Sequence, residues 1–447
     1  PNYTGGGIYC ANNSSPTITG NTITGNTSLL ACGGGIICIY NSSPIITGNT
    51  ITGNTAGELG GGIECANNSS PIIADNTITL NHARAGGGIS CYINSSPTIA
   101  NNTITGNTVA YAGGGIVSVY GSSPTITDNI ITGNAADSLG GGIGFSESSP
   151  TITHNTIEGN TAPYGGGIAC GSTSSGTIDS CTISGNSAVD EGGGIYCSNS
   201  SPRLQNVTIT GNSAVYDGGG IYCAYNSNPL LLNSILWNDI PQEVYFHQNG
   251  GPNSITISYS DVQGGEAGIV TNNNGTVYWL EGNIDEDPLF VGTGDHPFML
   301  QDLSPCVNAG IPDTTGLNLP EFDLAGNSRV FGGRIDMGAY ENQNVIVNAD
   351  EDLIPLITKL NQNYPNPFNP TTTINYSLKE NSKVSINIYN IKGQKVRTLI
   401  KDKLEAGNYS VIWYGKDNNG KSVSSGIYFY KLKTDKFEKT KKMILMK

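Results

Sequence analysis

The chain has 447 residues, of which only 13% are charged and 61 are glycine, a composition that would suit disorder if no repeat were present. Residues 1–360 hold 5 Lys and Arg against 29 Asp and Glu, whereas residues 361–447 hold 16 against 6. The acidic body disfavours nucleic acid as a partner, because phosphate contacts require Lys and Arg. No apolar run reaches the ~18 residues that mark a membrane-spanning helix.

An internal repeat organises residues 1–240. A G-G-G-I motif recurs at spacings of 25 to 28 residues, and each unit continues as in Ser14–Asn26, S-S-P-T-I-T-G-N-T-I-T-G-N. Three apolar positions recur per unit, which predicts three short strands per coil. A unit this short cannot bury its own apolar face and must stack on its neighbours. The repeat therefore predicts an all-β parallel β-helix of about nine regular coils. Its core would be stacked columns that include Ile8, Ile36 and Ile63.

Two asparagine positions recur at the bends of the repeat. The first lies between the second and third apolar positions, at Asn21, Asn49, Asn76, Asn102, Asn129 and Asn155. The second follows the third apolar position, at Asn26, Asn54, Asn81, Asn107, Asn134, Asn160, Asn186, Asn212 and Asn238. Asn tolerates left-handed backbone, and stacked amides can hydrogen-bond along a ladder. We interpret both sets as internal ladders at corners in preference to ligand-binding residues.

Seven of the ten cysteines occupy one repeat position, two residues after the Ile of G-G-G-I: Cys10, Cys38, Cys65, Cys91, Cys170, Cys197 and Cys223. Ser118 and Phe145 fill the same position in the two remaining coils. A position that accepts Phe is an interior one, so we expect small apolar fillers stacked inside the coil. Disulfides between adjacent coils are the second interpretation. Metal binding is the third, since no Cys-x-x-Cys or His pairing accompanies the column.

Catalytic signals are weak in this sequence. No nucleophile elbow, phosphate-binding loop or zinc-protease motif occurs, and the regular coils contain only two basic residues, Arg84 and Arg203. Glu64 is expected to face outward from the first strand of its coil, between Ile37 and Ser90. A carboxylate cluster of the kind that glycoside hydrolysis requires is not recognisable. Enzymatic activity stays open, with a non-enzymatic role favoured.

Variation in repeat length is concentrated in the segment just before each glycine triplet. Such segments align on one face of a repeat protein and often carry its binding function. In three successive coils they contribute Tyr164, Asp190, Glu191, Tyr216 and Asp217. Aromatic rings beside carboxylates suit a sugar-binding face or a Ca²⁺ site. Ordinary solvated turn residues are the alternative, and no cofactor other than Ca²⁺ is expected.

These repeat units resemble right-handed parallel β-helix proteins of the pectin-lyase-like class and the repeats of polymorphic outer-membrane proteins. The pieces Asp287–Phe290, Ser304–Gly310 and Asp336–Glu341 resemble the closing part of such bacterial proteins. We therefore expect residues 241–341 to form irregular coils and a cap over the open strand edges. Relatives with this fold include polysaccharide lyases and hydrolases, but their catalytic patterns cannot be placed on residues of this chain.

The C-terminal region carries a different pattern. Residues 342–360 lack repeat features and are expected to be a linker, and residues 361–447 contain about seven strand signals typical of a small Ig-like antiparallel β-sandwich. Its Y-P-N-P-F-N-P and I-Y-N-I-K-G-Q-K-V segments closely resemble the type A sorting domain of the type IX secretion system. The resemblance implies a Bacteroidetes protein, passage through the type IX translocon by way of residues 361–447, and a secreted or outer-surface location.

Three functions are compatible with these sequence features. The first is a non-enzymatic surface protein that adheres to or binds glycan, with surface glycan or lipopolysaccharide as partner. The second is a polysaccharide lyase or hydrolase. The third is an extracellular filament subunit that self-associates end to end through unpaired strand edges.

Overall fold

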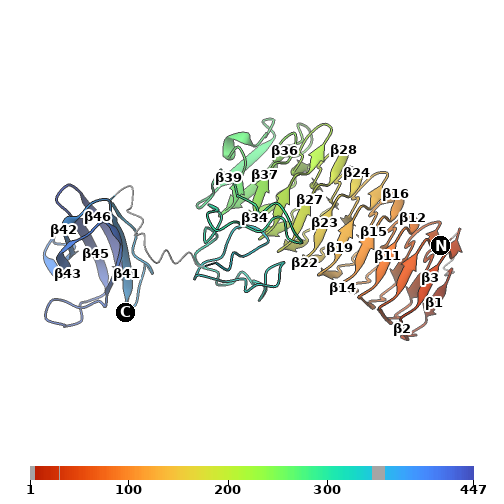
Figure 1. Cartoon of the computed structure of the whole chain (residues 1–447), viewed down its shortest axis with the longest axis horizontal. Helices are drawn as coiled ribbons and strands as arrows, with labels where there is room; N and C mark the ends of the chain where they lie inside the picture. Colours follow the sequence, from red (N-terminus) through yellow and green to blue (C-terminus); the bar gives the residue numbers. More distant parts are fainter. Residues whose placement is uncertain (1–5, 30, 345–357, 447) are drawn as a thin grey trace. The chain divides into compact units, whose positions relative to one another are not determined.

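The computed structural model describes residues 6–29, 31–344 and 358–446, which divide between two compact units, Pro1–Val345 and Ile346–Lys447 (Figure 1). The first unit is a parallel β-helix and the second is antiparallel, which confirms the predicted all-β fold class. A single 3₁₀ turn, Glu266–Gly268, interrupts the strands of the described ranges. No helix in these ranges has the length and apolarity to span a membrane. The predicted linker, residues 342–360, falls largely outside the described residues.

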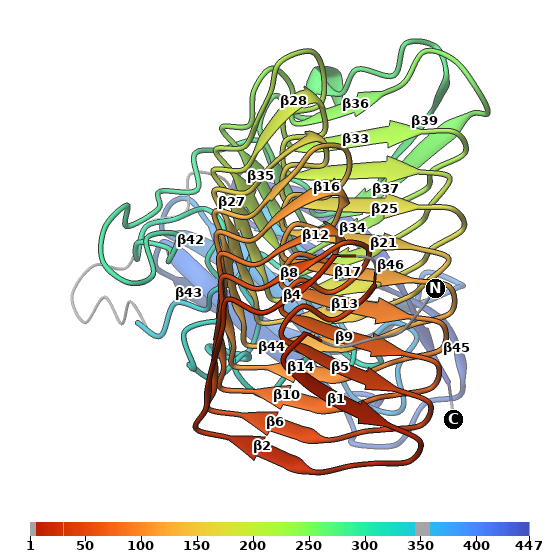
Figure 2. The same cartoon turned by 90° about the vertical axis from the view of Figure 1, so that its right-hand side faces the viewer.

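Each strand of the first sheet except the last begins at the Ile that follows a glycine triplet. Figure 2 shows the strands of this sheet stacked one above another. Ile8 pairs with Ile36 and Ile36 with Ile63, so the aliphatic column that the repeat predicts is present. The strands are β1 (Ile8–Ala11), β5 (Ile36–Ile39), β9 (Ile63–Ala66), β13 (Ile89–Tyr92), β17 (Ile116–Val119), β21 (Ile143–Ser146), β25 (Ile168–Gly171), β29 (Ile195–Ser198), β33 (Ile221–Ala224) and β36 (Val244–Phe246).

The second and third sheets consist mainly of three-residue strands whose middle residue points into the core. The second sheet contains β2 (Thr17–Thr19), β6 (Ile45–Thr47), β10 (Ile72–Ala74), β14 (Thr98–Ala100), β18 (Thr125–Thr127), β22 (Thr151–Thr153), β26 (Thr177–Asp179), β30 (Arg203–Gln205), β34 (Leu230–Leu232), β37 (Asn253–Ser258) and β39 (Gly275–Trp279). The third contains β3 (Thr22–Thr24), β7 (Thr50–Thr52), β11 (Thr77–Thr79), β15 (Thr103–Thr105), β19 (Ile130–Thr132), β23 (Thr156–Glu158), β27 (Thr182–Ser184), β31 (Thr208–Thr210), β35 (Ile235–Trp237) and β38 (Asp261–Val262).

A fourth sheet forms in the segments of variable length, so the expectation of three strands per coil is wrong. Its inward residues form a separate small core of Ala56, Ala83, Val109, Ala136 and Ala162. Alanine gives little hydrophobic signal in a sequence, which is why the strand escapes detection by apolar periodicity. The strands are β4 (Thr27–Ser28), β8 (Thr55–Ala56), β12 (His82–Ala85), β16 (Thr108–Ala112), β20 (Ala135–Ala136), β24 (Thr161–Tyr164), β28 (Ser187–Glu191) and β32 (Ser213–Ala214).

The glycine triplets allow the fourth sheet to fold closely over the first. Gly60 has φ +68°, and a Cβ on it would lie 2.7 Å from the Cβ of Glu64. A Cβ on Gly62 would lie 2.6 Å from the carbonyl oxygen of Gly88 in the next coil. Glu64 therefore points away from the helix interior but is fully buried under this backbone, and the expectation that it faces solvent is wrong.

Amide ladders hold the corners on both sides of the third sheet. The side-chain amide of Asn76 donates to Oδ1 of Asn102 at 3.0 Å and to the carbonyl oxygen of Ile46 at 2.9 Å. Equivalent bonds run along the first column from Asn21 to Asn155, where the next residue is Cys181. The second column runs from Asn26 to Asn212 and ends on Asp239. Asn238, which the repeat spacing assigns to this ladder, is exposed and lies outside it.

The repeated cysteines stack inside the first sheet. Cys10, Cys38, Cys65 and Cys91 pair in register through four successive coils, and Cys170, Cys197 and Cys223 pair through three. All ten cysteines of the chain are buried free thiols, so no disulfide joins adjacent coils. The seven repeated cysteines pack among the aliphatic columns of the core.

The closing segment, defined here as residues 283–344, runs back along the flank of the β-helix, whereas we expected a cap over its end. The carbonyl oxygen of Phe322 lies 2.9 Å from Nε2 of His154, and the amide of Ala339 donates to Oγ1 of Thr208 at 3.0 Å. His154 lies at the corner that follows β22 of the second sheet, and Thr208 is the first residue of β31 in the third. Within the segment, buried Arg329 donates to the carbonyl oxygen of Gly338 at 3.0 Å and lies 4.0 Å from the Glu341 carboxylate.

Over residues 358–446, the second unit has seven strands in two antiparallel sheets. One sheet contains β40 (Lys359–Leu360), β41 (Thr372–Leu378) and β44 (Gly407–Trp413), and the other β42 (Ser382–Asn390), β43 (Lys395–Leu404), β45 (Gly426–Lys433) and β46 (Glu438–Leu445). Trp413, Phe368 and Tyr430 lie in the shared core. The Y-P-N-P-F-N-P segment packs here because Phe368 is buried and Asn366 accepts a hydrogen bond from the amide of Ile444 at 2.8 Å.

Candidate functional site

A groove crosses the outer face of the first sheet in the middle coils. Its floor arises where outward-facing side chains become small, because Gly144 and Ala169 stand in register between Val117 and Tyr196. The resulting hollow has a volume of about 430 Å³. The change of side-chain size along one column is therefore what opens the surface here.

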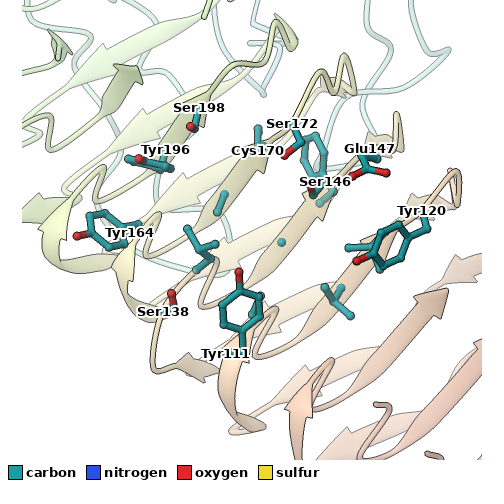
Figure 3. Close-up of a pocket in the computed structure, with 18 residues that line it drawn as sticks. Tyr111, Tyr120, Ser138, Ser146, Glu147, Tyr164, Cys170, Ser172, Tyr196 and Ser198 are labelled. Atoms are coloured by element: carbon teal, nitrogen blue, oxygen red, sulfur yellow. The ribbon is translucent and has the colours of Figure 1, made fainter. Parts of the chain in front are cut away.

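Tyrosine and serine side chains form the walls of the hollow, as Figure 3 shows. Tyr111 from β16 and Tyr164 from β24 lie on the side of the fourth sheet. Tyr120 and Glu147, from the turns that follow β17 and β21, lie on the opposite side. Tyr196 closes one end. Four serine hydroxyls add polar groups around the rim, from Ser138, Ser146, Ser172 and Ser198.

The groove continues toward the N-terminal coils. A second hollow of about 360 Å³ shares Tyr111, Val117 and Tyr120 with the first and extends to Arg84 and Tyr92. The rings of Tyr92 and Tyr120 meet edge to face with centroids 5.3 Å apart. The two hollows therefore form one continuous depression. We call it the tyrosine groove, after the five tyrosines that line it: Tyr92, Tyr111, Tyr120, Tyr164 and Tyr196.

A column of aromatic rings continues the groove toward the C-terminal coils. Tyr196, Tyr222 and Tyr245 stand in register on the first sheet, with successive ring centroids 5.5 Å apart and nearly parallel planes. Tyr164 adds a fourth ring at 5.3 Å from Tyr196. The phenol oxygen of Tyr222 lies 2.6 Å from Nδ1 of His247. The stacking fixes Tyr196 as a rigid end wall of the groove.

The structure places the five predicted binding residues along the outer edge of this column. Tyr164 pairs with Glu191, and Glu191 bridges to Asp217 in the next coil. Only Tyr164 lines the groove. Tyr216 is 64% exposed, and its amide donates to the carbonyl oxygen of Asp190. The five residues are thus neighbours along one edge, with a single member in the hollow.

The main hollow carries little charge, whereas the second hollow is lined by one acid and one base, Glu58 and Arg84. Among the described residues that line the main hollow, Glu147 alone carries a formal charge. Burial raises the pKa of the Glu191 carboxyl. Burial, followed by the nearby Glu191 carboxylate, raises the pKa of the Tyr196 phenol to about 12. The Tyr196 phenol thus stays neutral at physiological pH and presents a hydrogen-bonding hydroxyl.

The groove residues that sequence reasoning missed are Tyr120, Tyr196, Gly144 and Ala169. One signal could have identified the floor: aligning the residue directly after the G-G-G-I isoleucine gives Val117, Gly144, Ala169, Tyr196 and Tyr222 in consecutive coils. That alignment marks the step from small to aromatic side chains.

The described residues contain no recognisable metal-binding cluster. Within them, no group of three or more His, Cys, Asp and Glu side chains is arranged to hold a metal ion. The main hollow also lacks the two facing carboxylates that glycoside hydrolysis requires, since its described lining contains Glu147 and no second acid. Its chemistry is that of hydroxyl groups and aromatic rings.

Comparisons with known proteins agree with the fold. The family described as right-handed β-helix region matches residues 2–130, 108–240 and 164–284, and the FlgD Ig-like domain matches residues 367–437. No curated protein matches the chain. A solved structure of PorZ, described as a surface component of the type IX secretion system of Porphyromonas gingivalis, aligns with a TM-score of 0.15 and 21% identity. The alignment covers 20% of this chain and 11% of that one. The overlapping matches span well over half of the sequence, and the chain belongs to the right-handed β-helix family.

Proposed function

We propose that this protein is a non-enzymatic glycan-binding protein of the bacterial surface, and that it holds a saccharide chain in the tyrosine groove. The observation that carries the proposal is the hollow between Tyr111, Tyr120, Tyr164 and Tyr196, with its floor of Gly144 and Ala169. Tyrosine suits this role because its ring covers the apolar face of a sugar while its hydroxyl bonds to sugar hydroxyls.

The low charge of the hollow favours a neutral saccharide over a polyanionic one. A polyanion would need Lys or Arg at the walls, and the described lining of the main hollow contains neither. The length of the groove, which joins two hollows across several coils, favours a chain over a single sugar. Surface glycan and the saccharide of lipopolysaccharide are the partners that this chemistry fits.

The export part of the proposal rests on the second unit. Residues 361–447 are proposed to act as a type IX sorting domain that engages the translocon, which would place the first unit outside the cell. The resemblance of the Y-P-N-P-F-N-P and I-Y-N-I-K-G-Q-K-V segments supports this, together with the Ig-like match over residues 367–437.

A glycan array followed by calorimetry tests the groove. The variant Ala169→Tyr places in the floor the same residue that stands in register on the next strand, so it fills the hollow without introducing foreign chemistry. We expect it to abolish binding of a neutral oligosaccharide, as would Tyr196→Ala. Ala100→Tyr makes the same change on the outer face of the second sheet and is expected to bind like the wild type.

Each alternative function has its own readout in the same experiment. Release of reducing sugar or unsaturated product would replace the binding role with a lyase or hydrolase. Heat of binding on addition of Ca²⁺ alone, lost in the double variant Asp190→Asn with Asp217→Asn, would place the binding site at the edge that carries these acidic residues. A glycan array on which the folded protein binds no saccharide would contradict the proposal.

Export is tested by genetics in a bacterium with a type IX system. A reporter fused to residues 361–447 should reach the cell surface, and the same fusion in a strain without the translocon should stay in the periplasm. Asn366→Ala, which removes the acceptor of the Ile444 amide, should weaken export by loosening the segment that the sorting proposal depends on. Equal export in both strains would rule out the sorting role.

A further inference from the structure

The outer face of the third sheet carries threonine in a regular two-dimensional array. Its first five strands share one pattern, Thr-Ile-Thr, broken once where Ile130 replaces a threonine. The outward residues form two in-register columns. The first contains Thr22, Thr50, Thr77 and Thr103, and the second contains Thr24, Thr52, Thr79, Thr105 and Thr132. The first-column threonines are all exposed.

The spacing of this array follows from β-sheet geometry. Neighbours in one column lie ~4.8 Å apart because that is the distance between paired strands. The two columns lie roughly 6.6–7 Å apart because they are separated by two residues of one strand. The threonine backbone positions thus form a nearly rectangular lattice. Oxygen repeats of comparable size occur on the prism face of hexagonal ice.

The array is also braced at both ends of its strands. Amide ladders run along both ends of the third-sheet strands, with Asn76 bonded to Asn102 on one side and Asn81 to Asn107 on the other. Side-chain ladders of this kind are what keep a many-stranded sheet from twisting. Threonine itself is stiff at χ1 because it is β-branched. The Oγ1 atoms of Thr105 and Thr132 lie 3.0 Å apart, in contact along their column.

The face offers nothing that would attract a charged ligand. The outward residues of its first five strands include no Asp, Glu, Lys or Arg, and the first charged member is Glu158 on the sixth strand. Each threonine instead presents one hydroxyl and one methyl group. Such a surface can order water by hydrogen bonding at the hydroxyls while the methyl groups hold the water layer in place.

We propose that this threonine array binds ice. The ligand is the water lattice at the crystal surface, matched by the repeat of hydroxyls along and across the strands. The array lies on the third sheet and the tyrosine groove on the first, so the inference does not depend on the proposed glycan function. Ice binding would slow crystal growth around the protein or hold it at an ice surface.

Thermal hysteresis and ice recrystallisation assays on the full chain test the inference, with a fluorescent label to detect adsorption to a growing crystal. We expect faceted crystals, inhibited recrystallisation and a hysteresis gap. Thr77→Lys places a charged, longer side chain at the centre of the array and should remove most of that activity. Thr125→Lys makes the same exposed substitution on the second sheet, where Ile45 and Ile72 interrupt the column, and should keep it.

Each outcome decides the matter once circular dichroism shows that both variants are folded. Loss in Thr77→Lys with retention in Thr125→Lys supports the third-sheet site. Loss in Thr125→Lys alone moves ice binding to the second sheet and overturns the assignment. A wild type without hysteresis, crystal shaping or adsorption overturns the inference altogether, whatever the glycan array gives.

Discussion

The first six coils and the three that follow are built from one repeat, yet their outer faces differ. Thr77 in β11 is exposed, whereas Thr208, which occupies the same column in β31, is 1% exposed because the closing segment covers it. The interiors do not differ, since Ile78 and Ile209 are both fully buried. The contrast teaches that neighbouring coils dictate the interior, while the rest of the chain decides what each outer face becomes.

The largest effect on this contrast should come from Arg329→Ala. Arg329 is fully buried in the closing segment, beside the Glu341 carboxylate at 4.0 Å and bonded to the carbonyl oxygens of Asp336 and Gly338. Removing one member of a buried ion pair leaves an uncompensated charge, a loss of about 3–5 kcal/mol. We expect the closing segment to detach and Thr208 to become exposed, as measured by hydrogen exchange.

Arg84→Ala is the matched control for that variant. Arg84 pairs with Glu58 at 3.1 Å, but the side chains are 65% and 45% exposed. An exposed pair of this kind contributes roughly 0–1 kcal/mol. Equal losses of stability in the two variants would show that the closing segment is not held by its buried ions.

Two adjacent isoleucines on β19 allow a direct comparison of an interior substitution with an exterior one. Ile131 is fully buried and Ile130 is 50% exposed. Ile131→Ala should cost about 2–5 kcal/mol in the free energy of unfolding because it opens a cavity that the stacked coils cannot close. Ile130→Ala should change the stability by less than about 0.5 kcal/mol. Urea denaturation measures both, and similar midpoints would argue against column packing as the source of stability.

The interior was predictable because each column repeats one residue type. Register, the isoleucine columns and the stacking of Asn76 on Asn102 all follow from a spacing that is visible without coordinates. The fourth sheet was not predictable, because its inward residues are alanines such as Ala83 that resemble loop residues. The burial of Glu64 was missed for the same reason, since the covering strand was unknown.

The tyrosine groove was predictable only in part. The length variation before the glycines pointed to one edge, and Tyr164 from that edge lines the hollow. The floor depends on Gly144 and Ala169 being smaller than the residues at the same position in other coils. Such a difference in size forms no sequence motif, so a search for motifs does not find it. The path of the closing segment could not be read at all, because contacts such as Phe322 with His154 join residues far apart in sequence.

The amide ladder should give a smaller effect than the core. Asn102 accepts two hydrogen bonds from Asn76 through Oδ1, and its side-chain amide donates to Asn129. Asn102→Ala leaves buried donors and acceptors without partners, at about 1–3 kcal/mol. Asn21→Ala, at the exposed start of the same ladder, should cost less. Thermal melts of both variants check this, and equal shifts would mean that ladder position is irrelevant.

A pH-dependent effect concerns the last regular corner, where Asp239 replaces the ladder asparagine. Burial, then the neighbouring Asp239 carboxyl, raises the pKa of Glu243 from 4.5 to about 10. The folded state therefore binds a proton that the unfolded state releases, so this contribution is complete below pH 4.5 and declines as the pH rises toward 10. Glu243→Gln keeps the neutral shape and cannot ionise. We expect its stability to fall less steeply with pH than that of the wild type, by up to about 1.4 kcal/mol per pH unit.

Glu147→Gln, an exposed acid in the tyrosine groove, serves as the control and should leave the pH profile unchanged. Guanidinium denaturation at a series of pH values measures all three proteins. A Glu243→Gln profile parallel to that of the wild type would mean that Glu243 is ionised in the fold. The ladder would then end on two buried negative charges, and the covered coils would need a cation that the open ones do not. The two halves of the β-helix would then differ in buried charge, in addition to differing in whether the closing segment covers their outer faces.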